Sequence, residues 1–266
     1  MDGCTVLYFD SGIGGLSVFT EVDKLLANVN TIYAFDNKYF PYGILPEDKV
    51  IERCSSIIKR LLELYRIDII VVACNTASTV VLPTLRSSIK IPIVGVVPAI
   101  KPAAQISKTK YIGLLATPAT VSRKYTDMLI EDYAKDCFVE KLGSSELVRL
   151  AELKLHKNVD VTAEVAKVLY QFKGNDQIDV VVLGCTHFPW LKTEIEKTLT
   201  NVRCIDSGIA IANRVKFLLK DKIECGVKSE KIAFMTDTNI PDYAEQLELF
   251  KKFKFSSLNE LKIWAQ

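Results

Sequence analysis

Short apolar runs rich in β-branched residues recur along the chain and alternate with longer stretches of helical periodicity. Runs of this length are typical of buried strands in a parallel sheet. Their alternation with helical stretches indicates βα units, so we predict an α/β fold with mainly parallel sheets. The predicted strands span residues 5–9, 31–35, 68–73, 91–97, 111–116, 179–184, 201–205 and 231–235.

Two of these runs end in a cysteine that is followed by small polar residues. The first reads Ile-Ile-Val-Val-Ala-Cys74-Asn-Thr-Ala-Ser, and the second reads Val-Val-Val-Leu-Gly-Cys185-Thr-His-Phe-Pro. Open α/β sheets bind ligands beyond the carboxyl ends of their strands, which is where both thiols are predicted to lie. A lone cysteine at a strand end is usually a core residue, but two matched contexts favour a paired chemical role. Two opposed thiols would suit inversion at one carbon.

The residues that follow the two cysteines are suited to binding a polar ligand. Helix-start amides and polar side chains at these positions can bind a ligand and lower the pKa of a thiol. His187 is therefore interpreted as a group that tunes Cys185, although it could equally be a satisfied core histidine. A hydrolase that uses Cys185 as nucleophile and His187 as base is an alternative, but it needs only one thiol. The other residues of this set are Asn75, Thr76 and Thr186.

A glycine-rich segment, Phe-Asp10-Ser11-Gly-Ile-Gly-Gly15, follows the first predicted strand. Its glycines permit a tight turn whose helix-start amides face an anion such as a carboxylate or a phosphate. Asp36 ends the second strand, where a dinucleotide fold places its ribose-binding acid, but Ser17 replaces the third glycine of that fingerprint. We therefore favour a ligand site with Asp10 as an unpaired acid at its edge over nucleotide binding or a purely structural turn.

Two further segments carry weaker signals. Tyr42 and Gly43 lie in a loop after the second strand, and loops at this edge of a sheet often carry binding residues. Glu152 lies on a predicted helix and, taken alone, reads as surface charge.

Composition excludes several classes of protein. The 266 residues are 49% hydrophobic, and 34 basic residues nearly balance 32 acidic ones, so no nucleic-acid partner is indicated. No apolar run approaches the roughly 18 residues of a membrane helix. Seven cysteines without a C-x-x-C motif, and only two histidines, argue against disulfides and against a metal site. With no leader-like segment at the amino terminus, we expect a cytoplasmic protein.

Prolines at 92, 98 and 102 separate the two cysteine-bearing strands and indicate a domain crossing near residue 98. The segment Asp-Ser-Gly that ends at residue 208 is interpreted as the return to the first domain. We therefore predict a first domain of residues 1–97 and 207–266, which carries Asp10 and Cys74, and a second domain of residues 98–206, which carries Cys185 and His187.

Six motifs taken together resemble the glutamate racemases of the cofactor-independent aspartate/glutamate racemase family. They are Phe-Asp-Ser-Gly-x-Gly-Gly, Pro-Tyr-Gly, Cys-Asn-Thr-Ala-Ser, Gly-Val-Val-Pro-Ala-Ile-Lys-Pro-Ala, Gly-Cys-Thr-His-Phe-Pro and Asp-Ser-Gly. The resemblance runs from residue 6 to about residue 220. It implies two Rossmann-like or flavodoxin-like α/β domains related by pseudo-twofold symmetry, with the active site in the cleft between them.

The resemblance also implies a chemistry. Glutamate would be interconverted between its L and D forms without pyridoxal phosphate or any other cofactor, with one cysteine on each side of Cα. Cys74 would deprotonate D-glutamate and Cys185 L-glutamate, tuned by Asp10, His187 and Glu152. The implied substrate contacts are Asp10, Ser11, Tyr42, Gly43, Asn75, Thr76, Thr117, Thr186 and His187.

The product D-glutamate would supply peptidoglycan synthesis. Family members include dimers and enzymes activated by a peptidoglycan precursor, so a homodimer and such an activator are further expectations of the resemblance. Two alternatives stay open: a racemase of another acidic amino acid, chiefly aspartate, and a non-catalytic ligand-binding protein on the same fold.

Overall fold

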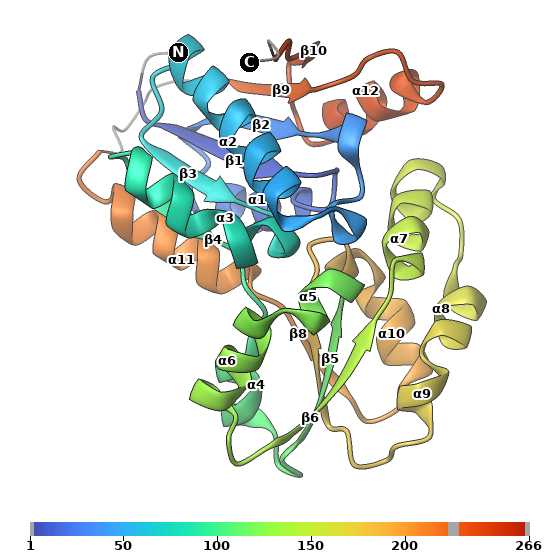
Figure 1. Ribbon diagram of the computed structural model, residues 1–266. Coiled ribbons are helices and arrows are strands. Elements are labelled where there is room, and N and C mark those ends of the chain that lie inside the picture. The colour runs from blue at the N-terminus through green and yellow to red at the C-terminus, as the bar shows by residue number, and fades with distance from the viewer. Residues whose placement is uncertain (1–2, 223–228, 264–266) are drawn as a thin grey trace. The chain divides into compact units, whose positions relative to one another are not determined.

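The computed structural model describes residues 3–222 and 229–263 and divides into two compact units. Unit 1 comprises Met1–Val96 and Gly208–Gln266, and unit 2 comprises Val97–Ser207. Each unit contains its own parallel sheet flanked by helices (Figure 1). The predicted α/β class with parallel sheets is therefore confirmed.

Unit 1 is built on a six-stranded sheet in the order β10-β9-β2-β1-β3-β4. Its elements are β1 (Thr5–Asp10), α1 (Leu16–Leu25), β2 (Asn30–Phe35), η1 (Asn37–Tyr39), η2 (Tyr42–Ile44), α2 (Glu47–Leu64), β3 (Ile69–Val72), α3 (Asn75–Ser88), β4 (Ile93–Gly95), α11 (Gly208–Leu219), β9 (Lys231–Met235), α12 (Tyr243–Lys252) and β10 (Ser257–Glu260).

Unit 2 is built on a four-stranded sheet in the order β6-β5-β7-β8. Its elements are α4 (Ile100–Ile106), β5 (Tyr111–Ala116), α5 (Pro118–Ser122), α6 (Lys124–Tyr133), β6 (Phe138–Gly143), α7 (Glu146–Lys157), α8 (Thr162–Val168), α9 (Tyr170–Lys173), β7 (Val180–Leu183), η3 (Phe188–Leu191), α10 (Lys192–Thr198) and β8 (Arg203–Ile205).

The two sheets repeat one winding pattern. In unit 1 the chain moves outward from β1 to β2 and later returns to place β3 on the other side of β1. In unit 2, β5 likewise lies between β6 and β7. Ligands of open α/β sheets bind at such reversals, beyond the carboxyl ends of the strands. The candidate ligand-binding segments are therefore the loops after β1 and β3 in unit 1 and after β5 and β7 in unit 2.

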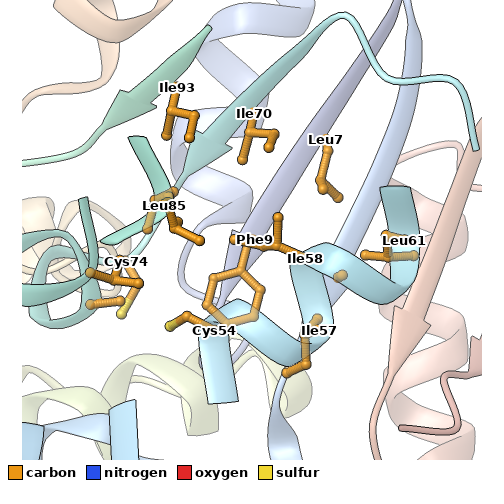
Figure 2. Close-up of a cluster of buried hydrophobic side chains, with 14 of the residues drawn as sticks. Leu7, Phe9, Cys54, Ile57, Ile58, Leu61, Ile70, Cys74, Leu85 and Ile93 are labelled. Atoms are coloured by element: carbon orange, nitrogen blue, oxygen red, sulfur yellow. The ribbon is translucent and has the colours of Figure 1, made fainter. Parts of the chain in front are cut away.

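The core of unit 1 follows the alternation of side chains along its strands. Leu7 and Phe9 of β1 point to one face, where they join the buried residues of α2 and α3 (Figure 2). Tyr8 points to the other face and meets Phe19 of α1 edge-on, with the ring centroids 5.6 Å apart. A strand buried on both faces must be apolar at every position, which explains the unbroken apolar run before Asp10.

All eight predicted strands are present, but β6 and β10 were missed. Both are edge strands. Glu140 and Lys141 interrupt the apolar pattern of β6, and in β10 only Leu258 is buried. An edge strand needs little apolar surface because one side faces solvent, so its sequence lacks the run that reveals a central strand. Among the residues described, no helix has the length and apolar character required to cross a bilayer.

Candidate active site

The turn after β1 is organised around the carboxylate of Asp10, which is fully buried. Its Oδ1 accepts the backbone N–H of Ser11 and its Oδ2 accepts that of Gly15, both at 2.6 Å. The expectation of an unpaired acid was therefore wrong, because a buried carboxylate requires such donors. These two amides bind an anion that the chain itself supplies.

Gly15 is required by this close packing. A Cβ at this position would lie 2.8 Å from the Tyr33 hydroxyl and 2.9 Å from Asp10 Oδ2. We expect Gly15→Ala to lower the free energy of unfolding by about 1–3 kcal/mol through overpacking. Gly174→Ala is the matched control, since a Cβ there meets nothing within 4 Å. Urea denaturation of both variants checks this, and equal stabilities would contradict it.

Cys74 ends the segment after β3 and is the N-cap residue of α3, with its side chain buried. Its Sγ lies 3.7 Å from the hydroxyl oxygen of Ser11. Burial and the nearby Asp10 charge raise the pKa of Cys74 well above its usual value, against the lowering effect of the Ala77 N–H and the Ser11 hydroxyl. Helix-start amides were expected to lower this pKa, but desolvation outweighs them. Burial therefore favours the thiol form of Cys74, and the residue must lose its proton before it can act as a base.

Asn75, the next residue along the chain, carries a side-chain donor that is unused among the described residues. Its side chain is 3% exposed, yet Nδ2 donates to no protein group among the described residues. A buried amide without a partner costs free energy, so such a group in a native fold calls for an explanation. A ligand acceptor, such as a carboxylate oxygen, would satisfy it.

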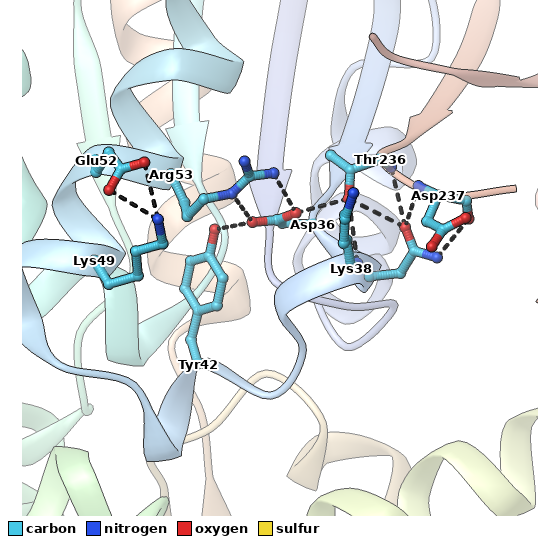
Figure 3. Close-up of polar contacts among 9 residues, drawn as sticks. Asp36, Lys38, Tyr42, Lys49, Glu52, Arg53, Thr236 and Asp237 are labelled. Atoms are coloured by element: carbon cyan, nitrogen blue, oxygen red, sulfur yellow. Dashed lines mark hydrogen bonds and ion pairs between the residues drawn. The ribbon is translucent and has the colours of Figure 1, made fainter. Parts of the chain in front are cut away.

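Tyr42 and Gly43 lie in η2, and the ring of Tyr42 is buried. The Tyr42 hydroxyl donates to Asp36 at 2.8 Å, and Asp36 also forms an ion pair with Arg53 (Figure 3). Asp36 is fully buried in these contacts, so it is not a ribose-binding acid.

In unit 2, the segment after β7 places a second thiol beside an imidazole. Cys185 Sγ lies 3.8 Å from Nδ1 of His187, whose Nε2 lies 3.0 Å from Oε1 of Glu152 on α7. Burial alone would lower the pKa of His187, but the hydrogen bonds and charges of Cys185 and Glu152 raise it to about 10. His187 is therefore an imidazolium at neutral pH, and its positive charge stabilises negative charge on the Cys185 sulfur.

The remaining unit 2 residues lie at the same sheet edge. Thr117 follows β5 and is the N-cap residue of α5, where its hydroxyl oxygen accepts the N–H of Thr120 at 3.3 Å. Thr186, which lies between Cys185 and His187 in the sequence, is buried. Thr117 thus has a structural role as a helix cap.

The structure gathers the predicted residues into two groups. Asp10, Ser11 and Cys74 meet in unit 1, and Cys185, His187 and Glu152 meet in unit 2. Across residues 3–222 and 229–263, all six cysteines are free, and no group of three or more His, Cys, Asp and Glu side chains is arranged so that it could hold a metal ion. Cys225 lies outside the described residues.

Comparison with known proteins identifies the family to which this chain belongs. The model of the Asp/Glu/Hydantoin racemase family matches residues 14–215. A curated glutamate racemase of Haemophilus ducreyi is 45% identical over 97% of this chain and 99% of its own, and one of Aliivibrio fischeri is 52% identical over 95% of each. A crystal structure of Escherichia coli glutamate racemase in complex with L-glutamate and the activator UDP-MurNAc-Ala matches with a TM-score of 0.93 and 44% identity, over 99% of this chain and 100% of that one. The chain therefore belongs to the Asp/Glu/Hydantoin racemase family, among its glutamate racemases.

Proposed function

We propose that this protein interconverts L-glutamate and D-glutamate by cofactor-independent proton transfer at Cα. One observation carries the proposal. At the winding reversal of each sheet lies a buried thiol with a polar side chain next to its sulfur: Cys74 beside Ser11 in unit 1 and Cys185 beside His187 in unit 2. Relatives that are similar over nearly the whole chain, all named as glutamate racemases, support the choice of substrate.

The Cα proton of an amino acid is very weakly acidic, so its removal needs a base in contact and stabilisation of the charge that develops on the carboxylate. Starting from D-glutamate, the Cys74 thiolate removes the proton, and the electron pair of the C–H bond passes into the carboxylate. The Cys185 thiol then delivers a proton to the opposite face of Cα. L-Glutamate reacts in reverse, with the two sulfurs exchanging roles.

The groups around each sulfur support the assignment of one cysteine as base and the other as acid. His187 stabilises the Cys185 thiolate that remains after protonation or that begins the reverse reaction. The amide of Asn75 is available to a substrate carboxylate. Two residues, Asp10 and Glu152, are proposed to tune the pKa values of the two thiols. The other proposed substrate contacts are Ser11, Tyr42, Gly43, Thr76, Thr117 and Thr186.

The biological setting follows from this activity. D-Glutamate would serve peptidoglycan synthesis, and we propose a peptidoglycan precursor as activator, because the E. coli protein was crystallised with UDP-MurNAc-Ala as its activator. The reaction requires free thiols, which a reducing compartment maintains, so we place the enzyme in the cytoplasm. We also propose that two copies of this chain form a homodimer.

Circular dichroism of purified protein with D-glutamate, without cofactor and with or without the precursor, tests the proposed reaction. We expect the signal to fall to that of the racemate, with a much smaller rate on D-aspartate. Faster turnover of aspartate would reassign the substrate, and ammonia release from glutamine would favour the hydrolase alternative. Glutamate binding without turnover would indicate a ligand-binding protein.

A further inference from the structure

Asp36 is the centre of a buried polar network at the end of β2. The guanidinium of Arg53 on α2 binds it through two hydrogen bonds, Nε to Oδ2 at 2.8 Å and Nη2 to Oδ1 at 2.9 Å. The Thr236 hydroxyl donates to Oδ1 at 2.6 Å. Three separate segments, η2, α2 and the chain after β9, therefore converge on one carboxylate (Figure 3).

The fourth donor to this carboxylate is the Tyr42 hydroxyl, and it links the network to the thiol of unit 1. The Tyr42 ring packs 6.3 Å from that of Phe9, centroid to centroid, inside the buried cluster that contains Cys54 and Cys74. The 3-10 turn η2, which contains Tyr42, contacts α3, the helix that begins after Cys74. The place of η2 beside the thiol is thus fixed at one end by Asp36.

The geometry points to Asp36 as a positioning residue that holds Tyr42 and Gly43 beside the Cys74 segment of unit 1, with Arg53 fixing the carboxylate. This inference rests on the proposed function, because it assigns Tyr42 and Gly43 to substrate binding. Asp36 itself does not meet the reacting atoms. A bidentate guanidinium fixes both the position and the plane of a carboxylate, which a single hydrogen bond does not. The carboxylate can then fix the direction of the Tyr42 hydroxyl.

Steady-state kinetics of Asp36→Asn, Tyr42→Phe and the double variant test this role. We expect each single change to raise KM for glutamate about tenfold, as the loss of a hydrogen bond to a charged group predicts, with a smaller change in kcat. The two changes act through one contact, so the double variant is expected to match the worse single variant rather than the product of both. Tyr42→Phe keeps the Asp36–Arg53 ion pair, so it remains informative if Asp36→Asn fails to fold.

Thr236→Val is the matched control, because it removes a hydrogen bond to Asp36 but leaves the contact with Tyr42. We expect it to lower Tm and to leave KM within about twofold, whereas a merely structural Asp36 would give all variants a lower Tm and an unchanged KM. An unchanged KM in Tyr42→Phe, or independent effects in the double variant, overturns the inference. Failure of the wild type itself to racemise glutamate would instead overturn the proposed function.

Discussion

Replacing either Cys74 or Cys185 with alanine is expected to abolish racemisation while sparing hydrogen exchange at Cα of one enantiomer. The loss should be at least about 10²–10⁴-fold, the usual contribution of a general acid or base. In Cys185→Ala, Cys74 still reaches the proton of D-glutamate and returns a solvent proton to the same face. Cys74→Ala should exchange only L-glutamate. Proton NMR in deuterated water follows the loss of the Cα signal of each enantiomer.

Hydrogen exchange at Cα distinguishes the two cysteines, whereas the rate of racemisation does not, because the two enantiomers have equal free energy in water. Their kcat/KM values for racemisation must therefore be equal, whichever cysteine is changed. Cys204→Ala is a matched control, since this thiol is also buried but lies in β8, away from the winding reversals. It should retain activity within about twofold. Racemisation by either alanine variant at the wild-type rate would contradict the assignment of two bases.

His187→Gln is expected to give the second largest loss, about 10²-fold or more in kcat. The change removes the positive charge beside the Cys185 sulfur while keeping a polar side chain of similar reach. Glu152→Gln should be milder, because it leaves the imidazole in place and removes only one of the groups that raise the pKa of His187. Initial rates at saturating glutamate compare the two variants, and a fully active His187→Gln variant would show that the imidazolium is not required.

The raised pKa of His187 also predicts how activity and stability depend on pH. Its folded pKa of about 10 exceeds the ordinary value of 6.5, so its contribution to stability is complete below pH 6.5 and is lost as pH rises through about 10. Between these limits the wild type should lose up to about 1.4 kcal/mol per pH unit relative to His187→Gln. Activity should also fall as pH rises through about 10, because the imidazolium beside Cys185 loses its charge, and in Glu152→Gln this fall should occur at lower pH. Urea denaturation and rate profiles between pH 6 and 10 measure both effects.

Much of this fold was predictable from the sequence, because buried central strands must be apolar on both faces. Strands β1, β3 and β7 are read directly from such runs, and the polar residues that end them mark the carboxyl edges of the sheets. The same reasoning placed Cys74 and Cys185 at strand ends. The edge strands β6 and β10 escaped it because burial on few positions leaves no apolar run.

The partners of the site residues were not predictable in the same way. The sequence offers no signal that Arg53 pairs with Asp36, or that Thr236 joins them from 200 residues away. The pKa of Cys74 was misjudged for a related reason, since local sequence shows the helix start that lowers it but not the burial that raises it. Long-range desolvation and pairing are properties of the folded chain.

The central claim, proton removal and delivery by two different thiols, is tested most directly by mass spectrometry of the first few per cent of wild-type turnover in deuterated water. Starting from D-glutamate, the account predicts that the L-glutamate formed carries deuterium at Cα while the remaining D-glutamate keeps its hydrogen, with the mirror result from L-glutamate. Product that retains the substrate hydrogen, or equal deuterium in product and remaining substrate, would indicate a single base and contradict the account.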